Sequence, residues 1–133
     1  ERGPYKNRFD LPGGSQKENE GLTETLVREF HEETGYKIEN YRNCRAYDIF
    51  VEEMNRIVHH IMVFYDVDIN VEQQNSVLET LDDELNDSSG TYWIDLEELD
   101  ISNASPLILK LVQELSNDKT ILEKVVFKNW KIL

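Results

Sequence analysis

Three glutamates follow one another closely in the sequence and could together bind a divalent cation. Residues 28–33 read REFHEE, which supplies Glu29, Glu32 and Glu33. A helix turns by about 100° per residue, so the three carboxylates are expected to share one helix face. Like charges repel at this separation, and a cation such as Mg²⁺ relieves the repulsion because it prefers carboxylate oxygens as ligands. The neighbouring Arg28 could orient one of the glutamates through paired hydrogen bonds.

An acidic helix face is most often an ordinary solvated surface, so the flanking residues decide between the two interpretations. Gly14, five residues, Glu20, seven residues and then the run from Arg28 to Tyr36 resemble the signature of the Nudix hydrolases. That signature ends in Arg-Glu-aliphatic-any-Glu-Glu-any-Gly-aliphatic, and every fixed letter is present. Phe30 and Tyr36 replace aliphatic residues, but both still supply apolar side chains.

Two further segments are similar to the same family. The sequence RFDLPGG at 8–14 resembles the strand that runs into the signature, and YWIDLEEL at 92–99 resembles a late strand and its turn. The resemblance covers most of residues 8–116. It implies an α+β fold, a Nudix-type α/β/α sandwich with a mixed central sheet, whose first strand is expected upstream of residue 1.

The resemblance also implies an activity, the hydrolysis of a diphosphate linkage with Mg²⁺ or Mn²⁺ as cofactor. The expected substrate is a nucleoside diphosphate linked to another group, or a nucleoside triphosphate. Arg28 is expected to orient a glutamate, and Glu20 is expected to be a structural partner or an outer-sphere helper. The metal ligands implied by the family are Glu29, Glu32, Glu33 and the carbonyl oxygen of Gly13. A module that senses nucleotides without cleaving them is the alternative, although such modules usually lose signature glutamates.

The general base and the substrate contacts are less closely defined. In some family members the base is the glutamate after the signature arginine, here Glu29, and in others it is a carboxylate on a distant loop. The acidic stretch 79–87 offers several candidates, of which we favour Glu84. Substrate contacts are expected from Arg8 on the phosphates and from Phe9 and Tyr47 on the base.

Helix and strand patterns indicate how these residues are positioned. Leu22, Leu26 and Phe30 recur every four residues, which predicts a helix over 22–34 whose apolar stripe is buried, with Gly35 ending it. Branched and aromatic residues predict a hairpin of strands 36–53 and 57–69 with its turn at 54–56. The other expected elements are a short helix near 78–85, a strand at 91–94, a helix from Pro106, and a tail that is a helix or, from Val125, a strand.

Composition limits the classes of partner. The chain of 133 residues suits one domain, expected to span 1–133, and its 14 basic against 27 acidic residues give a net charge of −13. Such a charge argues against nucleic acid as a partner. The single cysteine excludes an internal disulfide, and no apolar run is long enough to cross a membrane. We therefore expect a cytoplasmic enzyme acting on a small nucleotide, and a homodimer by analogy with the family.

Overall fold

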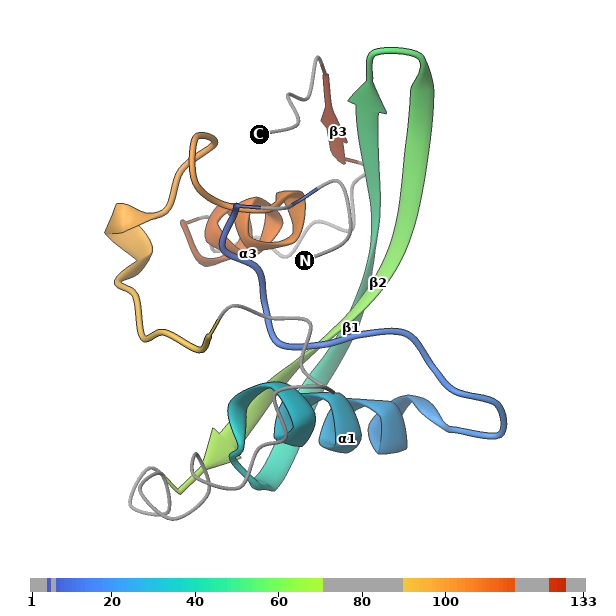
Figure 1. Cartoon of the computed structure of the whole chain (residues 1–133), viewed down its shortest axis with the longest axis vertical. Helices are drawn as coiled ribbons and strands as arrows, with labels where there is room; N and C mark the ends of the chain where they lie inside the picture. Colours follow the sequence, from blue (N-terminus) through green and yellow to red (C-terminus); the bar gives the residue numbers. More distant parts are fainter. Residues whose placement is uncertain (1–4, 6, 71–89, 117–124, 129–133) are drawn as a thin grey trace. The chain divides into compact units, whose positions relative to one another are not determined.

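The computed structural model describes residues 5, 7–70, 90–116 and 125–128 of the chain. The elements follow in the order α1 (Leu22–Thr34), β1 (Ile38–Glu53), β2 (Arg56–Ile69), the short 3₁₀ helix η2 (Leu96–Glu98), α3 (Pro106–Ser116) and β3 (Val125–Phe127) (Figure 1). These helices and strands confirm an α+β fold. No helix in the described ranges combines the length and apolarity needed to span a membrane.

Helix α1 has clear start and stop signals at its two ends. At the start, the Glu24 carboxylate accepts a hydrogen bond of 2.7 Å from the backbone N–H of Gly21. At the end, Gly35 adopts a left-handed conformation with φ of 75°, and its N–H donates to the carbonyl of His31. The predicted helix over 22–34 is therefore confirmed. The expected burial of its apolar stripe is wrong at Leu22, which is 46% exposed in the first turn, where Thr25 is the buried residue instead.

Strands β1 and β2 form the predicted hairpin. They are neighbours in the sheet and are joined by the two-residue turn at 54–55, so they run antiparallel. In the second half of β1, Tyr47, Ile49 and Val51 are buried, while the residues between them are exposed or half-buried. This alternation is the period of two expected of a strand with one covered face.

The chain divides into two compact units. The first unit contains residues 12–43 and 65–92, and therefore α1 with the loop before it. The second unit contains residues 2–11, 44–64 and 93–133, and its core is the cluster Tyr47, Ile49, Val51, Phe64 and Leu107. In the second unit β3 lies parallel to β1, with Ile49 opposite Val125. Helix α3 starts at Pro106, as its sequence predicted.

The expected strand at 91–94 is wrong. These residues form no strand, and Tyr92 and Trp93 are 63% and 70% exposed. The Thr91 hydroxyl instead donates to the backbone carbonyl of Glu33 at 2.8 Å, so the segment contacts the end of α1 through a side chain rather than through a strand ladder. Of the open alternatives for the tail, the structure shows a strand at 125–127. The helix expected near 78–85 lies outside the described residues.

Candidate functional site

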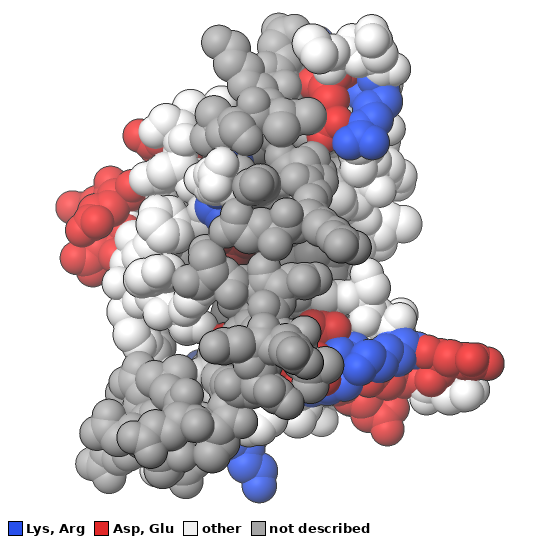
Figure 2. Space-filling view, in the orientation of Figure 1, with Lys and Arg blue, Asp and Glu red and all other residues white. Residues whose placement is uncertain are grey.

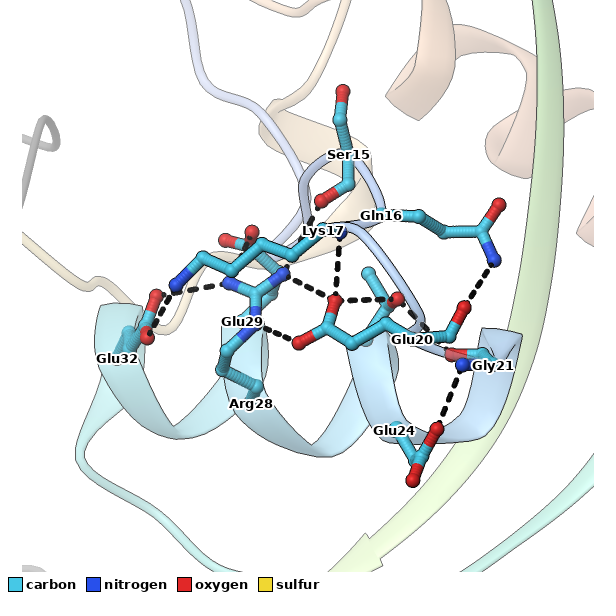
Figure 3. A network of polar contacts seen from close by, with 10 residues as sticks. Ser15, Gln16, Lys17, Glu20, Gly21, Glu24, Arg28, Glu29 and Glu32 are labelled. Atoms are coloured by element: carbon cyan, nitrogen blue, oxygen red, sulfur yellow. Dashed lines mark hydrogen bonds and ion pairs between the residues drawn. The ribbon is translucent and has the colours of Figure 1, made fainter.

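Arg28 is the centre of a hydrogen-bond network that joins α1 to the loop before it (Figure 3). Its Nε donates to Oε1 of Glu20, and its Nη2 donates to Oε2 of the same carboxylate at 2.8 Å. Its Nη1 donates to Glu29 at 2.6 Å and to Glu32 at 3.1 Å. Nη2 also donates to the backbone carbonyl of Ser15 at 3.2 Å. All five N–H groups of the guanidinium therefore have acceptors.

Glu20 ties the loop to the helix from the other side. Besides Arg28, its Oε2 accepts hydrogen bonds from the backbone N–H of Lys17 at 2.9 Å and from the hydroxyl of Thr25 at 3.0 Å. The Arg28 guanidinium, followed by the Lys17 N–H, lowers the pKa of the Glu20 carboxyl from 4.5 to about 2. Glu20 is therefore a charged acceptor throughout the neutral pH range, and the pair closes the loop onto α1.

The glycines of the loop lie against two of the predicted metal ligands. The backbone N–H of Gly13 donates to Oε2 of Glu33 at 2.9 Å. The Glu29 carboxylate packs so closely on Gly14 that a Cβ atom at this position would overlap with it. The fixed glycine of the signature thus has a steric reason, since a larger residue would push the Glu29 carboxylate away.

Replacing this glycine tests the contact. If Glu29 is a ligand of Mg²⁺, Gly14→Ala is expected to weaken Mg²⁺ binding about tenfold, because the added methyl group takes space beside the loop that the Glu29 carboxylate occupies. The measurement is a calorimetric titration with Mg²⁺. Glu18→Ala, at an exposed position of the same loop, is the control and is expected to bind Mg²⁺ as the wild type does. An unchanged Mg²⁺ affinity of Gly14→Ala would show that the Glu29 carboxylate has room to move.

The chemistry of the three glutamates fits a hard divalent cation. All three offer carboxylate oxygens, and those of Glu29 and Glu32 already converge on one nitrogen of a positively charged group. The cage is not preassembled, since no group of three acidic, histidine or cysteine side chains within the described ranges is close enough to hold a metal ion. Binding would therefore require these carboxylates to turn from their present partners.

The predicted substrate contacts all belong to the second unit. The Arg8 guanidinium donates to the carbonyls of Ile101 at 2.7 Å and Ala104 at 3.1 Å. Phe9 is 38% exposed, and its backbone forms an isolated parallel β-bridge with Ala104. Tyr47 is 3% exposed and lies within the core. Their role in substrate binding stays a prediction, as does the role of Glu84, which lies outside the described residues.

Sequence reasoning missed a half-buried polar pair in the second unit. The Tyr5 hydroxyl lies 2.5 Å from Nε2 of His60, and the two residues are separated by 55 positions. Burial raises the pKa of Tyr5 to about 12 and lowers the pKa of His60, so the pair joins a neutral hydroxyl to a neutral imidazole. Nothing in the sequence spacing signals this contact.

Acidic groups dominate the visible charge of the described residues. Figure 2 shows red carboxylate-bearing residues in several groups, with blue basic residues beside some of them. In the first unit, one such mixed group is Glu20, Glu29 and Glu32 with Lys17 and Arg28. A diphosphate would be repelled by the carboxylates unless positive charge were added, which again points to a cation.

Comparisons with known proteins agree with this chemistry. The family model described as NUDIX domain matches residues 1–115. A curated relative, the 8-oxo-dGTP diphosphatase of Buchnera aphidicola subsp. Schizaphis graminum, is 44% identical over 46 residues. The matched segment covers 35% of this chain and 35% of the relative, so the chain spans about a third of the length of that relative. No solved structure gives a significant match.

Proposed function

The chain belongs to the Nudix family, and from this premise we propose that it hydrolyses a diphosphate linkage in a nucleotide. The observation that carries the proposal is the complete signature at 14–36, in which Glu29 and Glu32 accept hydrogen bonds from Arg28 and Glu33 accepts one from the Gly13 N–H. A sensing module without catalysis would not need all three carboxylates. The name of the curated relative favours a nucleoside triphosphate over a nucleoside diphosphate linked to another group.

We propose that Glu29, Glu32 and Glu33, with the carbonyl of Gly13, hold Mg²⁺ or Mn²⁺. When bound, the cation supplies charge neutralisation for the diphosphate and lowers the pKa of a water molecule. Arg28 positions the carboxylates, because its Nη1 contacts two of them while Glu20 fixes the guanidinium. Glu29 packs on Gly14, and Glu33 accepts a hydrogen bond from the Gly13 N–H. The loop therefore sets the positions of these two carboxylates before a cation binds.

The general base takes the proton of the attacking water, and we propose two candidate residues for this role. Glu29 is one, since it belongs to the described site. Glu84 is the other, within the acidic stretch 79–87. A pH profile of kcat for Glu29→Gln and Glu84→Gln separates them, because loss of the base removes the acidic limb of the profile, whereas loss of a ligand weakens Mg²⁺ binding.

The experiment that tests the function is product release with Mg²⁺ from a panel of substrates. The panel contains nucleoside triphosphates including 8-oxo-dGTP, nucleotide sugars, ADP-ribose and dinucleoside polyphosphates. We expect cleavage of at least one member, and loss of that cleavage when the metal is removed with a chelator. Nucleotide binding without cleavage of any member would instead favour the sensing module.

The remaining features are proposed from family membership alone. We propose that the protein has the α/β/α sandwich with a mixed central sheet, that residues 1–133 form a single domain, and that two copies form a homodimer. We also propose that it acts in the cytoplasm on a small nucleotide, without nucleic acid or a membrane as partner.

A further inference from the structure

Lys17 is the basic residue of the site whose charged group is held most loosely. Its Nζ lies 3.7 Å from Oε1 of Glu32, and its side chain is 63% exposed. An exposed ion pair of this length contributes little to stability. The backbone of Lys17, by contrast, is fixed, since its N–H donates to Oε2 of Glu20 at 2.9 Å and its carbonyl accepts from the Glu20 N–H at 3.1 Å. Figure 3 shows the Lys17 ammonium beside Glu32 and the Lys17 backbone N–H bonded to Glu20. Because the backbone is fixed and the ion pair is weak, the ammonium group can leave Glu32 for another anion.

The other basic residues of the first unit are not placed to do this. All five N–H groups of Arg28 donate hydrogen bonds. If the guanidinium turned away from one of its carboxylates, that carboxylate would be repelled by the other carboxylates around it. Arg42 pairs with Asp68 at 2.7 Å on the hairpin. Lys37 is exposed and comes directly after the last residue of the signature in the sequence. Among the described residues of this unit, Lys17 is the cation that contacts a predicted ligand through one weak pair.

The charges of the site indicate which group the Lys17 ammonium would contact if it left Glu32. The three proposed ligands and Glu20 supply four carboxylates against the two cations Lys17 and Arg28, which gives a formal net charge of about −2. The four carboxylates are those of Glu20, Glu29, Glu32 and Glu33. One divalent cation neutralises that excess, and a diphosphate then brings further negative charge that needs a positive partner. Once the Glu32 carboxylate coordinates the divalent cation, it no longer forms the ion pair with the Lys17 ammonium.

We propose that Lys17 is a substrate-binding residue for the diphosphate, held by Glu32 until a divalent cation takes that carboxylate. This inference rests on the proposed function and adds a residue to it. Lys17 acts as a competitor of the cation for Glu32 and as a partner of the phosphates. It reaches the phosphates as a point charge on a flexible stem, so it contributes to affinity more than to geometry.

The test measures binding without turnover. Methylenediphosphonate, an analogue of diphosphate whose P–C–P bridge cannot be hydrolysed, is titrated calorimetrically into the protein at saturating Mg²⁺. Lys17→Met is expected to weaken its binding roughly tenfold, the value of one hydrogen bond to a charged group. Lys17→Arg should retain most of the affinity, and Lys37→Met, which removes an exposed charge after the signature, should stay within about twofold of the wild type.

A second titration with Mg²⁺ alone separates substrate binding from a structural role. Lys17→Met is expected to bind Mg²⁺ at least as tightly as the wild type, because a competitor for Glu32 is gone. Parallel losses of Mg²⁺ and diphosphonate affinity, equal diphosphonate affinity of wild type and Lys17→Met, or no diphosphonate binding by the wild type would each overturn the proposal. Turnover is measured separately, so an inactive protein with Lys17-dependent binding would reject hydrolysis and support the role of Lys17.

Discussion

Glu32→Gln is expected to lower kcat/KM at least about a hundredfold on the best substrate of the panel, and Glu33→Gln is expected to do the same. Each substitution keeps the shape of the side chain and removes one negative charge. A divalent cation contributes several kcal/mol of charge stabilisation, and each 1.4 kcal/mol corresponds to a factor of about ten in rate. Loss of one carboxylate ligand is therefore expected to remove two factors of ten or more.

The loss should be traceable to the cation. Calorimetric titration of both variants should show weaker Mg²⁺ binding, and raising the Mg²⁺ concentration should restore part of the activity. Glu39→Gln is the matched control, because it makes the same chemical change at an exposed position of β1 in the same unit. Wild-type activity in both Glu32→Gln and Glu33→Gln would contradict the proposed ligand set.

The part of the site that the sequence predicted is held by contacts between residues near one another in the chain. The hydrogen bonds from Arg28 to Glu20 and from Gly13 to Glu33 join residues eight and 20 positions apart. The limits of α1 come from adjacent signals, the Glu24 carboxylate at its start and the left-handed Gly35 at its end. Fixed spacing is informative here because a loop and a helix of set length leave few other arrangements.

The contacts that sequence reasoning missed join distant segments. Tyr5 meets His60 across 55 positions, and Arg8 meets Ala104 across 96. Such contacts depend on how the chain folds back, which no local pattern encodes. The expected strand at 91–94 failed for a related reason, since its β-branched and aromatic residues satisfy a propensity but find no partner strand in the part of the chain that the structure describes. The partners of Arg28 beyond one glutamate were also missed, because the sequence does not show how many acceptors converge on one guanidinium.

Arg28→Met is expected to lower both kcat/KM and Mg²⁺ affinity by about tenfold to a hundredfold, the usual cost of losing a partner that orients metal ligands. The substitution keeps an unbranched apolar stem but removes all five N–H donors. Glu20, Glu29 and Glu32 then face one another without a cation between them, and their repulsion turns the carboxylates outward. Arg28→Lys should recover only part of the loss, because a lysine restores the charge but not the fork that contacts Glu20 twice.

The pKa of Glu20 gives this prediction a readout that does not depend on activity. In the wild type Arg28 holds this pKa at about 2, below its ordinary value of 4.5, so the contribution of the pair is complete above about pH 4.5 and is lost as the pH falls through about 2. An NMR titration of the Glu20 carboxyl should show that midpoint in the wild type and a midpoint moved upward in Arg28→Met. Arg42→Met removes an exposed arginine paired with Asp68 and should leave the Glu20 midpoint and the activity unchanged. An unmoved Glu20 midpoint in Arg28→Met would mean that the guanidinium is not what fixes the loop to α1, and the positioning role of Arg28 would then fall with it.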